Sequence, residues 1–213
     1  MPSLWDYRCS GFQAASCLWN KRVCYGEIMI KRLVLSGFLA ALTGCSSTVQ
    51  NIDATPPKKG CVGQIEQTTQ NLTPVANKQL LQEAIGAELE GKLCDGTVLK
   101  ATAPVKVYRV WDKEKPYSAF GRWWSLAKPK GSRDEYRKKN NICPEWSKLN
   151  VVSHCELKTG TNIVVGTGQS AQCDGMILDK SPENQVYVPN DTRNSILFVE
   201  NCSQAKDWPA KGH

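Results

Sequence analysis

Hydrophobic and polar residues alternate along the second half of the chain with the period of two that is typical of strands. The clearest case is the stretch 105–111 (VKVYRVW), in which valines alternate with charged or larger side chains. Two further stretches are separated only by Thr159-Gly160, so we expect them to pair as a hairpin. The strands predicted beyond the first are 150–158, 161–166, 185–188 and 195–200.

Only short helices are predicted. Residues 77–89 carry apolar side chains at helical spacing, with Asn77 as the N-cap and Gly91 as a stop. Residues 132–135 (SRDE) match a capping box, and Pro144 suits the first turn of another short helix. Strands with short helices inserted between them, and no internal repeat, predict an α+β fold with a compact, mainly antiparallel β core.

Residues 29–45 have the pattern of an export signal. Lys31 and Arg32 precede an apolar run of about ten residues, which is too short to span a bilayer. The run ends in LTGC, which resembles the lipobox of bacterial lipoproteins and implies that Cys45 is lipidated. Ser46, rather than Asp, follows directly, which resembles the sorting pattern of outer-membrane lipoproteins. The alternative is a chance apolar stretch before a buried cysteine. Residues 1–28 do not fit a signal, so we expect translation to start at Met29.

The remaining cysteines also indicate an exported protein. An even number of cysteines in an exported chain predicts disulfides, here three, with the pairing left open. Zinc is not expected, because the chain has no CxxC pair and two histidines. The disulfide candidates are Cys61, Cys94, Cys143, Cys155, Cys173 and Cys202.

The patterns divide the chain into five parts. The tether is polar and contains a Pro-Pro pair, as expected of a linker. The parts are an extension (1–28), a lipoprotein signal (29–44), the tether (45–60), a helical lead-in (61–100) and a β-rich, disulfide-stapled domain (101–213).

Positive charge gathers in one segment. The chain has 27 Lys and Arg against 20 Asp and Glu. Eleven of these cations and four of these anions lie in residues 106–139, interleaved with seven aromatic rings. Such a segment suits a phosphate-bearing ligand whose base or ring stacks on an aromatic side chain. The alternative is a solvated basic face over an aromatic core; nucleic acid is not expected as a partner of an envelope protein.

Five short motifs follow one another in a recognisable order. They are VYRVWD (107–112), GRWWS (121–125), YR (136–137), PEW (144–146) and QVYVP (185–189). This order resembles bacterial toxin domains of the NAD-consuming ADP-ribosyltransferase and NAD-glycohydrolase type, in which a "YR" strand precedes a "GxxWT"-like strand. The resemblance spans about residues 105–190, roughly half of the exported chain.

The resemblance implies an ADP-ribosyltransferase-like fold, NAD as substrate, and no metal or permanently bound cofactor. It gives phosphate binding to Arg109 and the ribose-facing role to Gln185, with Glu183 on the same strand face. Transferases carry glutamate where this chain has Gln185. A glutamine there resembles glycohydrolases of the tuberculosis-necrotizing-toxin type, so hydrolysis is favoured over transfer to a target protein. The residues implied to stack the nicotinamide or orient the ribose are Tyr108, Trp123, Trp124 and Ser125.

A second hypothesis is a non-catalytic envelope lipoprotein that binds a protein partner, of the surface-exclusion or inhibitor type. The two hypotheses differ in geometry. The enzyme requires Arg109, Gln185 and an accessible tryptophan to meet in one cleft, whereas the binding protein does not.

Overall fold

The structure, a computed structural model, describes residues 58–65 and 70–210. The predicted signal, the lipobox with Cys45 and most of the tether lie outside these residues, so they stay predictions. No helix in the described ranges is long and apolar enough to cross a membrane.

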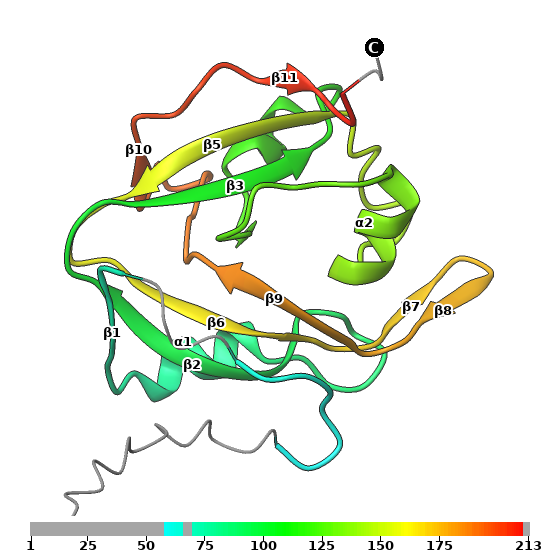
Figure 1. Cartoon of the computed structure of the whole chain (residues 1–213), viewed down its shortest axis with the longest axis horizontal. Coiled ribbons are helices and arrows are strands. Elements are labelled where there is room, and N and C mark those ends of the chain that lie inside the picture. The colour runs from blue at the N-terminus through cyan, green and yellow to red at the C-terminus, as the bar shows by residue number, and fades with distance from the viewer. Residues whose placement is uncertain (1–57, 66–69, 211–213) are drawn as a thin grey trace, which may run out of the picture. The chain divides into compact units, whose positions relative to one another are not determined.

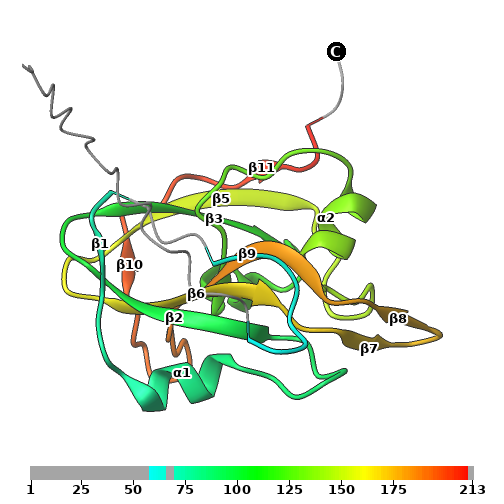
Figure 2. The same ribbon diagram turned by 60° about the horizontal axis from the view of Figure 1, so that its bottom comes forward.

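Two antiparallel sheets make up most of the fold (Figure 1). The first has five strands in the order β1 (Leu72–Pro74), β2 (Leu93–Ala101), β6 (Asn162–Gly168), β9 (Ser181–Tyr187) and β4 (Trp123–Trp124). In the second, β5 (Val151–Leu157) pairs with β3 (Val105–Trp111), β10 (Val199–Glu200) and β11 (Lys206–Asp207). A separate hairpin of β7 (Ala171–Cys173) and β8 (Met176–Leu178) projects from the body (Figure 2). The α+β prediction is confirmed.

The main core fills the space between the two sheets. Leu99, Val165 and Val186 from the first sheet pack with Val107 and Leu157 from the second, all almost fully buried. A smaller cluster lies on the other face of the first sheet, under helix α1 (Lys78–Ala84) (Figure 2). Strand β6 is therefore covered on both faces.

The predicted hairpin between residues 150–158 and 161–166 is wrong. Both segments are strands, β5 and β6, but they belong to different sheets and do not pair with each other. Both edges of β6 are occupied by β2 and β9, so the turn at Thr159-Gly160 carries the chain from one sheet to the other. In that turn Gly160 N donates to Ala101 O of β2 at 2.7 Å.

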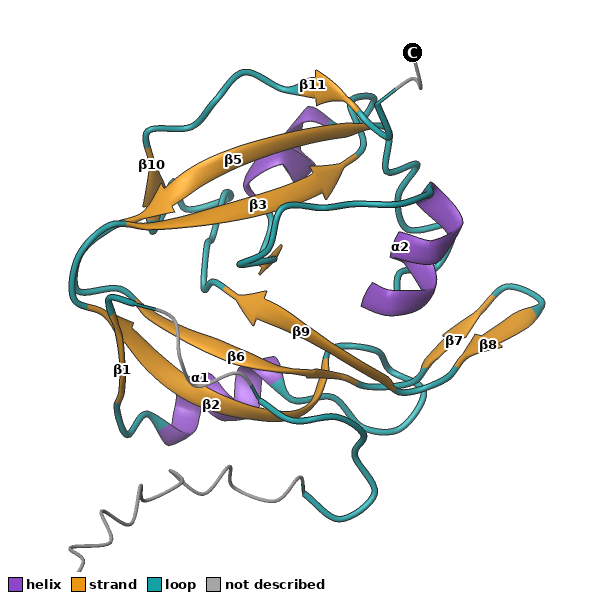
Figure 3. Ribbon diagram, in the orientation of Figure 1, coloured by secondary structure: helices purple, strands orange, loops and turns teal. Residues whose placement is uncertain are grey.

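The described residues form two α-helices and a short 3-10 helix (Pro116–Phe120) that was not predicted (Figure 3). Helix α1 begins as expected, with Asn77 Oδ1 accepting from Leu80 N at 3.0 Å, but it ends at Ala84. It stops early because Gly86 N donates to Leu93 O, which draws the chain towards β2.

The predicted capping box is confirmed, whereas the helix expected at Pro144 is wrong. Helix α2 (Arg133–Asn140) opens with reciprocal hydrogen bonds between Ser132 and Glu135. Residues 144–146 form a turn, closed by a 3.1 Å hydrogen bond from Trp146 N to Cys143 O. A disulfide ties Cys143 to Cys173, and residues 147–150 after the turn have no regular secondary structure, with Leu149 at a positive φ of 50°, so the turn does not continue as a helix.

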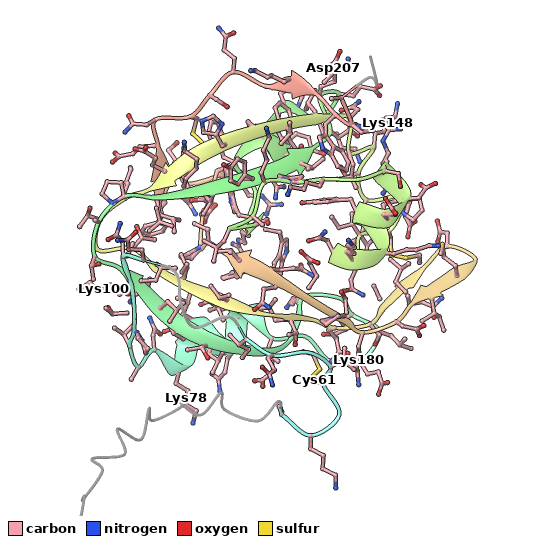
Figure 4. The ribbon with its side chains drawn as sticks, in the orientation of Figure 1. Cys61, Lys78, Lys100, Lys148, Lys180 and Asp207 are labelled. Atoms are coloured by element: carbon pink, nitrogen blue, oxygen red, sulfur yellow. A yellow bond between two sulfur atoms is a disulfide. The ribbon has the colours of Figure 1, made fainter. Side chains whose placement is uncertain are left out.

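Six cysteines form three disulfides, as predicted, and the structure supplies the pairing. The Cys61–Cys94 bond joins the N-terminal segment to β2, on the side of the molecule where Figure 4 labels Cys61. The Cys143–Cys173 bond links the turn after α2 to β7. The Cys155–Cys202 bond joins β5 to the C-terminal segment.

Candidate functional site

The two sheets are joined beside a pocket. Tyr108 on β3 and Ser125, directly after β4, exchange two backbone hydrogen bonds of 2.8 Å, which brings the last strand of the first sheet against the second. A pocket of about 200 Å³ lies next to this junction, and we call it the seam pocket. The polar and aromatic residues that line it are Lys92, Arg109, Ser118, Trp123, Trp124, Tyr136, Asn140, Asn141, Trp146, Ser147 and Gln185.

Arg109 is held in the pocket wall by backbone groups. Its Nε donates to Ser118 O at 2.7 Å and its Nη1 donates to Trp123 O. The guanidinium carbon lies 5.9 Å from the centre of the Trp124 ring, within the range of a cation–π contact. A Cβ on residue 121 would lie 2.2 Å from Arg109 Nη2, so a larger residue there would displace the guanidinium.

The charge of Arg109 has no acidic partner in the part of the chain that the structure describes. The salt bridges found there involve other residues, so pairing with Asp112 or Glu145 does not explain this arginine. Burial lowers the pKa of Arg109 to about 10, which leaves the side chain positively charged at neutral pH. Lys92 adds a second cation to the lining, and no Asp or Glu of the described residues lines the pocket. The site therefore suits an anionic ligand.

Three indole rings surround the pocket in different ways. Trp124 is buried and donates from Nε1 to Gly121 O at 2.7 Å, so it belongs to the core. Trp123 is half-buried and meets Tyr187 edge-on, with 5.2 Å between the ring centres. Trp146, in the turn after α2, is 47% exposed. Trp123 and Trp146 are thus the rings with surface left for stacking.

Two buried amide side chains lie opposite the indoles. Gln185 on β9 and Asn141, the C-cap of α2, are 6% and 3% exposed. Gln185 Nε2 and Asn141 Oδ1 have no hydrogen-bond partner within residues 58–65 and 70–210, whereas Asn141 Nδ2 donates to Asp179 O at 2.6 Å. Asn141 has a positive φ of 52°, a conformation that asparagine tolerates better than most residues.

An adjoining hollow shares two residues with the seam pocket, Tyr136 and Asn140. Glu183 lines this hollow together with three lysines, 128, 130 and 139. Burial raises the pKa of Tyr136 to about 12; the nearby Arg109 cation acts in the opposite direction, and Glu183 adds to the rise. The phenol is therefore neutral at physiological pH.

The structure brings together four of the residues that the resemblance singled out. Arg109, Trp123, Trp124 and Gln185 all line the seam pocket. Glu183 and Ser125 line the adjoining hollow, where Ser125 Oγ donates to Ala127 O at 2.8 Å.

Tyr108 does not reach either cavity. It lines a third hollow beside His154, on the other side of β3. No role was predicted for five of the residues that line the seam pocket: Tyr136, Asn140, Asn141, Trp146 and Lys92. The one available signal was the Asn140-Asn141 pair at the end of a predicted helix, where an asparagine in the left-handed conformation is common.

Comparisons with known proteins give little. No family model matches the chain, and no curated protein matches it. A search of solved structures finds a chain in the structure of Tne2 in complex with Tni2, at 16% sequence identity and a TM-score of 0.42. The alignment covers 59% of this chain and 100% of that chain. A TM-score of this size does not establish a common fold.

Proposed function

We propose that the protein binds NAD in the seam pocket and hydrolyses the bond between nicotinamide and ribose. One observation carries the proposal: Arg109, Trp123 and Gln185 line one pocket, whose lining includes cations and, among the described residues, no carboxylate. This is the geometry that the enzyme hypothesis required and that a partner-binding lipoprotein did not. The outer-membrane address, through lipid on Cys45, is part of the same proposal.

The pocket is too small for a whole dinucleotide. Sites for drug-sized ligands measure roughly 300–1,000 Å³, whereas the seam pocket measures about 200 Å³. It therefore encloses one flat ring, with Trp123 available for stacking. The ribose and phosphates extend towards the adjoining hollow, where three lysines offer charge to the pyrophosphate.

Glu183 is the acidic residue that lines this hollow in the described structure. Loss of nicotinamide leaves a cation-like ribose, which a nearby carboxylate stabilises. Water attacks the ribose carbon, the bond to the nicotinamide nitrogen breaks, and its electron pair leaves with nicotinamide. The products are nicotinamide, ADP-ribose and a proton, which the Glu183 carboxylate is placed to accept.

Chromatography of nicotinamide and ADP-ribose released by the purified, disulfide-intact protein tests this proposal. We expect NAD to be consumed and Glu183→Gln to slow it by about 10²-fold or more. Glu200→Gln, an exposed glutamate on β10, is the matched control and leaves the rate unchanged. No loss of NAD with wild-type protein would refute the proposal.

The β7–β8 hairpin favours a second candidate, a lipoprotein that binds a protein partner. The hairpin projects from the body, and Met176 and Ile177 at its end are 41% and 53% exposed (Figure 1). Exposed apolar side chains on a projecting element are typical of a contact surface. This candidate predicts no NAD turnover by the wild-type protein.

A further inference from the structure

Two residues that line the seam pocket each have a polar atom without a partner among the described residues, and the two atoms are of opposite kinds. Gln185 Nε2 is a hydrogen-bond donor and Asn141 Oδ1 is an acceptor. Both side chains are more than nine-tenths buried. Since buried polar groups in folded proteins are almost always paired, the two atoms call for a group that satisfies them.

The orientation of Asn141 is fixed by its other end. Nδ2 donates to Asp179 O at 2.6 Å, so Oδ1 is the atom that stays free. The 141–143 segment is further held by the Cys143–Cys173 disulfide, two residues beyond Asn141.

Gly168 allows the two free atoms to lie near each other. A Cβ at this position of β6 would lie 2.1 Å from Asn141 Oδ1 and 2.9 Å from Gln185 Nε2. Any larger residue would push the two side chains away from β6. The donor and the acceptor thus lie close to each other, beside the backbone of Gly168.

A primary carboxamide has the complementary pair of groups. Its carbonyl oxygen accepts one hydrogen bond and its NH₂ donates another, side by side. A ketone offers only the acceptor. Because Trp123 and Trp124 are among the residues that line this pocket, the proposed ligand is an aromatic carboxamide.

We propose that Asn141 and Gln185 form a carboxamide clamp, in which Gln185 Nε2 donates to the carbonyl and Asn141 Oδ1 accepts from the NH₂ group. The identification of that carboxamide with the nicotinamide end of NAD rests on the proposed function. In this arrangement Gln185 recognises the leaving group, because the free atom that it presents is a donor and a donor does not stabilise a cation on ribose. Asn141 becomes the residue that determines specificity.

Titration of the disulfide-intact protein with nicotinamide and with 3-acetylpyridine tests the clamp by calorimetry or ligand-observed NMR. The two ligands are both neutral, so their difference does not depend on Arg109 or Lys92. We expect nicotinamide to bind roughly tenfold tighter, the scale of one buried hydrogen bond. Asn141→Gly keeps the left-handed backbone and should remove this preference while leaving 3-acetylpyridine unchanged.

Two further variants complete the test. Gln185→Met, similar in shape but without the donor, should weaken both ligands. Asn201→Gly, an exposed asparagine with a similar φ of 49°, is the matched control and should change neither. Equal binding of both ligands to the wild type, binding of neither, or a preference that survives Asn141→Gly would overturn the clamp.

The same variants separate the clamp from the activity. If nicotinamide binds selectively but NAD is not cleaved, the clamp stands and the proposed hydrolysis fails. If NAD and its 3-acetylpyridine analogue are cleaved alike by wild type and Asn141→Gly, hydrolysis stands and the clamp fails.

Discussion

Replacing Arg109 by alanine should destabilise the protein as well as impair its site. The guanidinium donates to the carbonyls of Ser118 and Trp123 and lies over Trp124. Hydrogen bonds from a charged donor contribute roughly 1.5–3 kcal/mol each, and the ring contact adds about 0.5–1 kcal/mol. Burial of the cation, which lowers its pKa to about 10, opposes them; it costs on the order of 3 kcal/mol.

The net loss expected for Arg109→Ala is about 2–4 kcal/mol, since the variant also leaves two carbonyls without a donor. Urea unfolding at pH 7 with the disulfides intact measures it through tryptophan fluorescence. Lys106→Ala, exposed on the same strand, should change the free energy of unfolding by less than about 0.5 kcal/mol. Arg109→Lys should recover little, because an ammonium cannot donate to both carbonyls with the fork of a guanidinium.

A midpoint for Arg109→Ala that coincides with the midpoint for Lys106→Ala would refute this reasoning. In that case the carbonyls of Ser118 and Trp123 find other donors or water. The arginine would then serve the ligand alone. Activity of Arg109 variants should therefore be measured at a temperature where both variants are fully folded.

Two further predictions concern the walls of the pocket. The raised pKa of Tyr136 means that its contribution to stability is complete below pH 10 and is lost as the pH rises towards 12. Between pH 9 and pH 12, the free energy of unfolding measured in urea should fall by on the order of 2–3 kcal/mol more in the wild type than in Tyr136→Phe. An identical fall in both proteins would contradict this prediction. Replacing Cys143 and Cys173 by serine should cost about 3–4 kcal/mol and weaken nicotinamide binding. Removing the Cys61–Cys94 bond, which closes a chain segment of similar length, should cost similar stability but leave binding intact.

A strand could be predicted from the sequence where its residues alternate between a buried and an exposed face. Strand β3 was predicted with its exact bounds, because its valines alternate with more polar residues. Strand β2 was not predicted, since its register shifts between Leu93 and Asp95 and breaks the alternation. Strand β6 is buried on both faces, so its sequence shows no period that would reveal its pairing partners. Pairing between distant segments is a tertiary property. Because β6 pairs with β2 and β9, the turn at residues 158–161 connects two sheets instead of closing a hairpin.

The residues of the seam pocket were also predictable only where local sequence patterns determine their positions. Successive residues of a strand point to opposite faces, and Tyr108 lines a hollow on the other side of β3 from the seam pocket that Arg109 lines. Glu183 and Gln185 should share a face, but the register of β6 and β9 shifts between Thr167 and Gly168, and Glu183 lies in the adjoining hollow. The Asn140-Asn141 pair is a sequence signal for a left-handed helix end, but the place of Asn141 in the pocket also depends on its contact with Asp179, which the sequence does not show.

The residues of the seam pocket have two different roles: Arg109 forms a fixed part of its wall, whereas Gln185 and Asn141 select the ligand. Arg109 is held by two backbone carbonyls, so a ligand does not have to order this side chain when it binds. Gln185 and Asn141 hold their free atoms in place without a partner, which costs stability in the empty protein. A change in Arg109 should therefore alter the pocket itself, whereas a change in Asn141 should alter which ring the pocket accepts. For that reason discrimination between ligands, rather than loss of activity, is the property that separates recognition from folding at this site.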